Sequence, residues 1–252
     1  MIKPGKPELI VMLTHHDFTV SNAAEIFEQC RESKARCWGM KEHRLPPEEM
    51  RSLFTRMKAC GMTTFLEVVG YTEEEGMAGA ELAFRCGCDV MMGTKYFDSI
   101  NDFCKSHHLR YMPFVGNVTG RPSVLTGTME EIIDEAQGYL AKGVFGIDLL
   151  GYRYEGDARK LISTFVKEVG APVCLAGSID GFERLDEVGE VNPWAYTIGS
   201  AFFEGRFLRG TAEKTVPSEA TDAIVGDNLE KFREQIDTVC EYMVETNRQD
   251  EK

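Results

Sequence analysis

Two stretches decide the fold: Val173-Cys174-Leu175-Ala176-Gly177-Ser178-Ile179-Asp180 and Ala195-Tyr196-Thr197-Ile198-Gly199-Ser200-Ala201-Phe202-Phe203. Each is a short apolar run that ends in Gly-Ser and precedes a segment with the pattern of a helix start. A run that is apolar on both faces is typical of a parallel strand covered by helices. The two stretches therefore predict two consecutive strand-turn-helix units.

The two Gly-Ser turns also predict a binding site for an anion. A helix N-terminus carries unpaired N–H groups and partial positive charge, and glycine lets an anion approach the backbone. A single Gly-Ser after a buried strand is more typical of an ordinary turn, but two in consecutive units favour a ligand. We predict that Gly177, Ser178, Gly199 and Ser200 bind a phosphate.

The same unit recurs along the chain. Short apolar runs that read as strands occupy residues 9–13, 37–40, 63–69, 89–92, 111–115, 145–150, 173–176 and 195–198, each followed by a helical pattern. Eight such units predict a single-domain (β/α)8 TIM barrel over residues 8–208, followed by an additional C-terminal helix over residues 226–248. One face of that helix is apolar, so it packs either on the barrel or on a second subunit of a homo-oligomer. The loop over residues 116–128 is either a lid or an irregular connection.

Composition restricts the class of protein. The chain has 252 residues, of which 43% are hydrophobic, enough for one large core. A net charge of -13 argues against nucleic acid and anionic membranes as partners. The eight cysteines show no C-x-x-C spacing, and we find no signal-like or membrane-spanning run, so we expect a cytoplasmic protein with reduced cysteines.

The Ala176-Gly177-Ser178-Ile179 and Ile198-Gly199-Ser200-Ala201 segments, with the spacing of the units, resemble the phosphate-binding TIM barrels. This superfamily holds histidine-biosynthesis isomerases, phosphoribosylanthranilate isomerase, N-acylmannosamine-6-phosphate epimerases and ribulose-phosphate epimerase. The resemblance implies that the two turns bind a substrate phosphate. The chain departs from the motifs of the individual subfamilies, so the resemblance assigns none of them.

Active sites of this fold lie at the C-terminal ends of the strands. Glu67 and Asp148 interrupt apolar strands, where a carboxylate is either paired or has a raised pKa. The other candidates at strand ends are Lys41, Lys95, His15 and Asp17. A structural ion pair or a solvated lysine is the alternative for each.

These residues predict an isomerase, epimerase or lyase that needs no cofactor and acts on a phosphorylated sugar or a similar small molecule. Glu67 or Asp148 removes a proton next to a carbonyl, and Lys41 stabilises the enediolate oxygen. One alternative is a metal-dependent aldolase or epimerase whose divalent cation is held by Asp17, Glu42, His43, Glu67 and Asp148. Another is a non-catalytic barrel that senses a phosphorylated metabolite.

Overall fold

The computed structural model of the protein describes residues 6–209 and 226–249. Eight parallel strands form its central sheet: β1 (Glu8–Met12), β4 (Cys37–Lys41), β5 (Thr63–Val68), β6 (Val90–Gly93), β7 (Arg110–Met112), β10 (Ile147–Leu149), β11 (Val173–Leu175) and β12 (Ala195–Ile198). Their order in the sheet is β10-β11-β12-β1-β4-β5-β6-β7. The predicted barrel strands are thus confirmed, with ends shifted by one or a few residues.

The two outer strands of this order, β7 and β10, approach each other and nearly close the barrel. Phe114 and Asp148 form a parallel bridge, and the backbone N–H of Asp148 donates to the carbonyl of Pro113 at 3.0 Å. Because Pro113 carries no N–H group, the ladder is interrupted at this seam.

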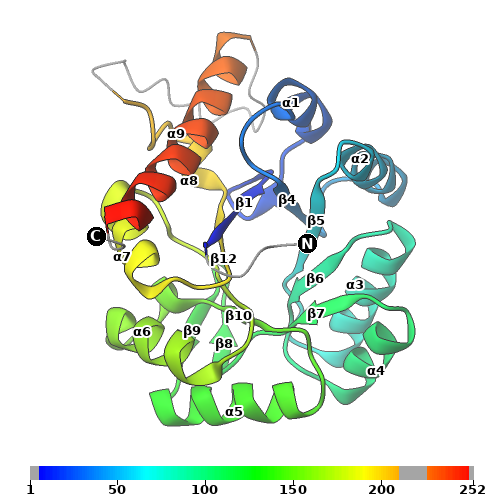
Figure 1. Cartoon of the computed structure of the whole chain (residues 1–252). Coiled ribbons are helices and arrows are strands. Elements are labelled where there is room, and N and C mark those ends of the chain that lie inside the picture. The colour runs from blue at the N-terminus through cyan, green and yellow to red at the C-terminus, as the bar shows by residue number, and fades with distance from the viewer. Residues whose placement is uncertain (1–5, 210–225, 250–252) are drawn as a thin grey trace.

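Helices surround the barrel (Figure 1). They are α1 (Ala23–Cys30), α2 (Pro47–Ala59), α3 (Glu73–Arg85), α4 (Asp98–Ser106), α5 (Met129–Ala141), α6 (Ala158–Val169), α7 (Phe182–Val191), α8 (Ser200–Phe203) and α9 (Asp227–Gln249). Within the described residues, no helix is both long and apolar enough to cross a membrane.

The C-terminal helix α9 packs on the chain's own helices. It lies against α1, α7 and α8 (Figure 1). Its apolar face is buried there, through Leu229, Phe232, Ile236, Val239 and Met243. Of the two arrangements that the sequence left open, packing on the barrel accounts for this face.

The loop over residues 116–128 is a hairpin. Strands β8 (Asn117–Thr119) and β9 (Val124–Thr126) pair in antiparallel fashion, and Leu125 bridges to Tyr154. An irregular connection was therefore the wrong alternative, because backbone pairing and the burial of Val118 and Leu125 order this segment.

Side chains fill the barrel interior except at the C-terminal ends of the strands. Ile10, Met12, Cys37, Phe65, Val90, Met92, Met112, Cys174 and Ala195 form this inner core. Phe145 and Trp194 pack against this core. Their two rings meet edge to face, with centroids 5.5 Å apart. Both precede their strands, so aromatic rings fill the N-terminal end of the barrel and the polar residues lie at the C-terminal end.

Candidate active site

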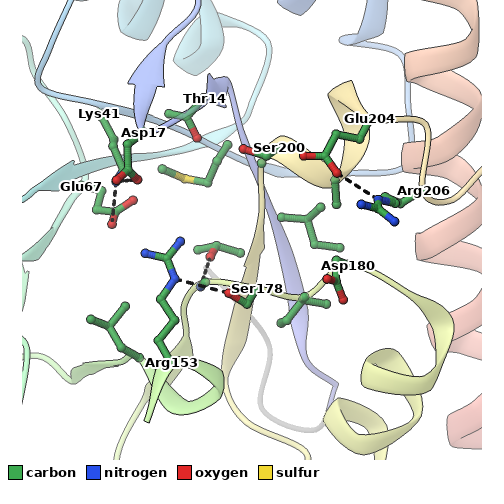
Figure 2. Close-up of a pocket in the computed structure, with 18 residues that line it drawn as sticks. Thr14, Asp17, Lys41, Glu67, Arg153, Ser178, Asp180, Ser200, Glu204 and Arg206 are labelled. Atoms are coloured by element: carbon green, nitrogen blue, oxygen red, sulfur yellow. Dashed lines mark hydrogen bonds and ion pairs between the residues drawn. The ribbon is translucent and has the colours of Figure 1, made fainter. Parts of the chain in front are cut away.

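A cavity of about 330 Å³ opens at the C-terminal ends of the strands (Figure 2). It is lined by Met12, Thr14, Asp17, Lys41, Glu67, Leu150, Arg153, Gly177, Ser178, Ile179, Asp180, Thr197, Ile198, Gly199, Ser200, Ala201, Glu204 and Arg206. These residues come from segments at the ends of β1, β4, β5, β10, β11 and β12. The cavity therefore brings Lys41, Glu67 and Asp17 to the same site as both Gly-Ser turns.

A small hairpin after β1 shapes one wall of the cavity. Strands β2 (Thr14–His15) and β3 (Phe18–Thr19) pair, and the two residues between them, His16 and Asp17, have φ values of 48° and 68°. Two left-handed residues in a two-residue loop match the right-handed twist of a hairpin, but they are strained for residues other than glycine. This backbone conformation places the Asp17 side chain in the cavity wall.

This hairpin also holds the end of β4. The buried hydroxyl of Thr19 accepts a hydrogen bond from the Lys41 N–H at 2.9 Å and donates one to the Lys41 carbonyl at 2.8 Å. Both backbone groups of Lys41 are thereby fixed by one side chain.

The Lys41 ammonium lies between two carboxylates (Figure 2). Its Nζ is 2.7 Å from Oδ1 of Asp17 and 3.5 Å from Oε1 of Glu67, and its side chain is only 7% exposed. Burial disfavours the charged amine, but the charges of Glu67 and Asp17 outweigh burial and raise the pKa of Lys41. Burial likewise opposes ionisation of Asp17, yet its hydrogen bond to Lys41 and the nearby cations lower the pKa of Asp17 overall.

Asp148 lies in the barrel wall and is not among the lining residues. Its side chain is fully buried. Burial, together with the negative charge of Glu67, raises the pKa of Asp148 well above its ordinary value. Its environment therefore favours the neutral carboxyl form of Asp148, beside Glu67, which pairs with Lys41.

The two Gly-Ser turns differ in conformation. After β12, the helix α8 begins directly at Ser200, as expected. After β11, α7 begins only at Phe182, because Gly177 and Ser178 have φ values of 80° and 61° and turn the chain first. Consecutive residues in such a turn can direct successive N–H groups to one side, a geometry that binds anions.

Arg153 is a charged lining residue that the sequence reasoning missed, as it missed Glu204 and Arg206. It ends the short 3-10 helix η1 (Gly151–Arg153), and its Nε donates to the Ser178 hydroxyl at 3.4 Å. Its guanidinium lies between Ser178 and the group formed by Asp17, Lys41 and Glu67 (Figure 2). A Cβ at Gly177 would be 2.6 Å from Arg153 Nε, so glycine is required for this approach. The signal in the sequence is an arginine that follows the sixth predicted strand, at the end of the barrel where active sites lie.

The remaining candidates lie outside the cavity lining. His15 is buried and stacks on Phe203, with ring centroids 5.2 Å apart. Lys95 is exposed beyond β6. Catalytic roles for these two residues stay predictions.

Two residues of the predicted metal set also lie elsewhere. Glu42 accepts a hydrogen bond from the Val69 N–H at 3.1 Å and pairs with His43, and both line a separate cavity beside α3. Within residues 6–209 and 226–249, no three His, Cys, Asp or Glu side chains gather as metal ligands would.

No protein-family model matches the sequence, and no curated protein is significantly similar to it. Solved structures do match. That of native KDPGal has a TM-score of 0.66 at 11% identity, over 98% of this chain and 100% of that chain. A 4-hydroxy-2-oxoglutarate aldolase/2-deydro-3-deoxyphosphogluconate aldolase from TTHB1 has a TM-score of 0.62 at 13% identity, over 94% and 95%. The N-acetylmannosamine-6-phosphate 2-epimerase from Clostridium perfringens has a TM-score of 0.58 at 13% identity, over 78% and 87%.

At these identities the likeness extends to the fold alone. The chain has the (β/α)8-barrel fold of these solved structures.

Proposed function

We propose that the protein is an isomerase, epimerase or lyase that transfers a proton next to a carbonyl group of a phosphorylated sugar or similar small metabolite, without a metal ion. The observation that carries this proposal is the buried Lys41 ammonium between Asp17 and Glu67, in the same cavity as Arg153 and the two Gly-Ser turns.

The charge of Lys41 defines its role. A lysine that attacks a carbonyl must be a neutral amine, whereas the two carboxylates raise the pKa of Lys41 and keep it charged. A fixed ammonium in a largely buried site is suited to stabilise the negative oxygen that forms when a carbon next to a carbonyl loses its proton. We therefore assign Lys41 to electrostatic stabilisation and not to a Schiff base.

The two carboxyl groups have different environments. Glu67 lines the cavity and pairs with Lys41, so its carboxylate is placed to take a proton from the substrate. Asp148 is buried and its raised pKa favours the protonated form, so it is suited to supply a proton in the return step, through Glu67 or after a small local movement. Two carboxyl groups in different environments are a common arrangement for acid and base catalysis.

We place the substrate phosphate at the turns after β11 and β12. The Arg153 guanidinium lies beside Ser178 and is suited to bind two phosphate oxygens at once. Gly177 and Gly199 have no Cβ, which lets an anion approach the backbone of both turns. Binding energy from this remote group would hold the reacting carbons near Lys41 and Glu67.

The positions of the predicted metal ligands support a reaction without a metal. Glu42 and His43 line another cavity and Asp148 is buried, so of that predicted set only Asp17 and Glu67 line the site, and both pair with Lys41. Activity that survives a strong chelator would support this part of the proposal.

A thermal-shift titration tests the phosphate site. Sugar phosphates of three to six carbons are compared with the same unphosphorylated sugars, for the wild type, for Arg153→Gln and for the matched control Arg159→Gln. Arg159 lies on α6 outside the cavity lining and pairs with Glu187. A ligand at one hundred times its Kd adds about 2.7 kcal/mol, which is on the order of 5–10 °C for a chain of this size.

The expected result is a shift with a sugar phosphate that is lost in Arg153→Gln and kept in Arg159→Gln. An absence of any shift with every phosphorylated compound would overturn the proposed function. Turnover by the wild type that is lost in Glu67→Gln, while the ligand still raises the Tm of that variant, would support catalysis. Ligand response without turnover in the wild type would favour a sensor instead.

A further inference from the structure

The charges that line the cavity restrict the substrate beyond its phosphate group. Three cations line it: Lys41, Arg153 and Arg206. Four carboxylates line it as well: Asp17, Glu67, Asp180 and Glu204. The substrate must fit the charge that remains after these groups pair with one another.

Two of the three cations already have carboxylate partners. Lys41 lies between Asp17 and Glu67, at 2.7 Å and 3.5 Å. Arg206 pairs with Glu204, with Nε 2.9 Å from Oε2. Both pairs are drawn with dashed lines in Figure 2, on opposite sides of the cavity.

Arg153 is different. Among the described residues that line the cavity, it is the one cation with no carboxylate within ion-pair distance, and its Nε donates to the neutral Ser178 hydroxyl. It lies at the turn proposed for the phosphate, so a phosphate bound there would neutralise it.

A second anionic group on the substrate would then meet no unpaired cation in the described lining. Near the reacting end it would approach the carboxylates of Asp17 and Glu67, both largely buried, where repulsion between like charges is weakly screened. Toward α8 it would have to displace Glu204 from Arg206.

We infer that the substrate carries a single anionic group, a phosphomonoester, and that the rest of it is a neutral polyhydroxy aldehyde or ketone. Sugar-acid phosphates, which add a carboxylate, are selected against. This inference rests on the proposed function and specifies the substrate class of the same site.

Matched pairs of ligands test the inference by isothermal titration calorimetry at low ionic strength. The pairs are glyceraldehyde 3-phosphate with 3-phosphoglycerate, ribose 5-phosphate with 5-phosphoribonate, and glucose 6-phosphate with 6-phosphogluconate. Members of a pair share their carbon number and phosphate and differ in the carboxylate. At the best-fitting length, we expect the neutral sugar phosphate to bind at least tenfold more tightly than the acid.

A variant then tests the cause. Glu204→Gln leaves Arg206 without its partner, so we expect the preference within the pair to shrink severalfold. The control Glu168→Gln changes an exposed carboxylate of α6 outside the lining and should leave the preference unchanged.

The outcomes separate the two proposals. A sugar-acid phosphate that binds as tightly as its neutral partner, or more tightly, would overturn the inference and leave the phosphate site standing. If no phosphorylated compound binds, the proposed function fails, and the inference fails with it. An unchanged preference in Glu204→Gln would overturn the charge argument for Arg206.

Discussion

Replacement of Thr19 by valine should loosen the end of β4 and displace Lys41. Valine has nearly the shape of threonine but lacks the hydroxyl, which exchanges two hydrogen bonds with the Lys41 backbone, at 2.9 Å and 2.8 Å. Thr19 is fully buried, so water does not replace the lost partner. The Lys41 N–H and carbonyl would therefore both lose this partner.

The expected magnitude follows from these two groups. A buried backbone group that loses its partner costs about 1–3 kcal/mol, and relaxation of the short hairpin β2–β3 should keep each near the lower half of that range. We therefore expect a loss of about 2–4 kcal/mol in the free energy of unfolding, or about 5–15 °C in Tm. Turnover should fall as well, because the Lys41 ammonium shifts relative to Glu67.

Two variants serve as comparisons in urea and thermal unfolding. Thr19→Ser keeps the hydroxyl and should recover most of the stability and turnover. Thr55→Val removes a hydroxyl that donates to the Arg51 carbonyl on the exposed surface of α2, so it should change stability by less than about 1 kcal/mol. If Thr19→Val unfolds within the error of the wild type, the hairpin does not hold Lys41 as described.

Three further predictions concern the cavity. Because the pKa of Asp148 is raised, its ionisation opposes folding above the ordinary carboxyl pKa of about 3.9. The stability of Asp148→Asn relative to wild type should therefore increase as pH rises from 4 toward 8 in urea titrations, and a constant difference would contradict the raised pKa of Asp148. Gly177→Ala places a Cβ at a φ of 80° and 2.6 Å from Arg153 Nε, so it should cost about 1–2 kcal/mol and weaken phosphate binding in calorimetry; unchanged affinity would argue against this turn as the phosphate site. Lys41→Met should lower kcat by about two to three orders of magnitude while sugar-phosphate binding persists, whereas a variant with normal kcat would remove Lys41 from the mechanism.

The barrel could be predicted because its strands are local patterns. Each is an apolar run of limited length, followed by a helix with its own signals, such as the capping box of Thr72 and Glu75. Glu67 and Lys41 could be placed at the site because the fold brings all C-terminal strand ends to one edge.

The direction of the polar side chains at the strand ends could not be predicted from the sequence pattern. Glu42 follows Lys41 directly, yet it turns toward Val69 and away from the cavity. Asp148 lies within a strand that faces the barrel interior, so it is buried instead of lining the cavity.

The conformation of the loops could not be predicted from the sequence either. The hairpin after β1 depends on left-handed φ values at His16 and Asp17, which sequence patterns predict for Asn-Gly and not for His-Asp. Arg153 reaches Ser178 across 25 positions of sequence, and such a contact has no local signal.

Proton exchange with solvent tests the central claim most directly. The sugar phosphate that binds best is incubated in D2O with the wild type and with Glu67→Gln, and NMR follows deuterium at the carbon next to the carbonyl. We predict that the wild type incorporates deuterium at that carbon, with or without net conversion, and that Glu67→Gln binds the same compound without exchange. A wild-type protein that binds the compound and leaves every carbon-bound hydrogen unexchanged would contradict proton transfer at this site.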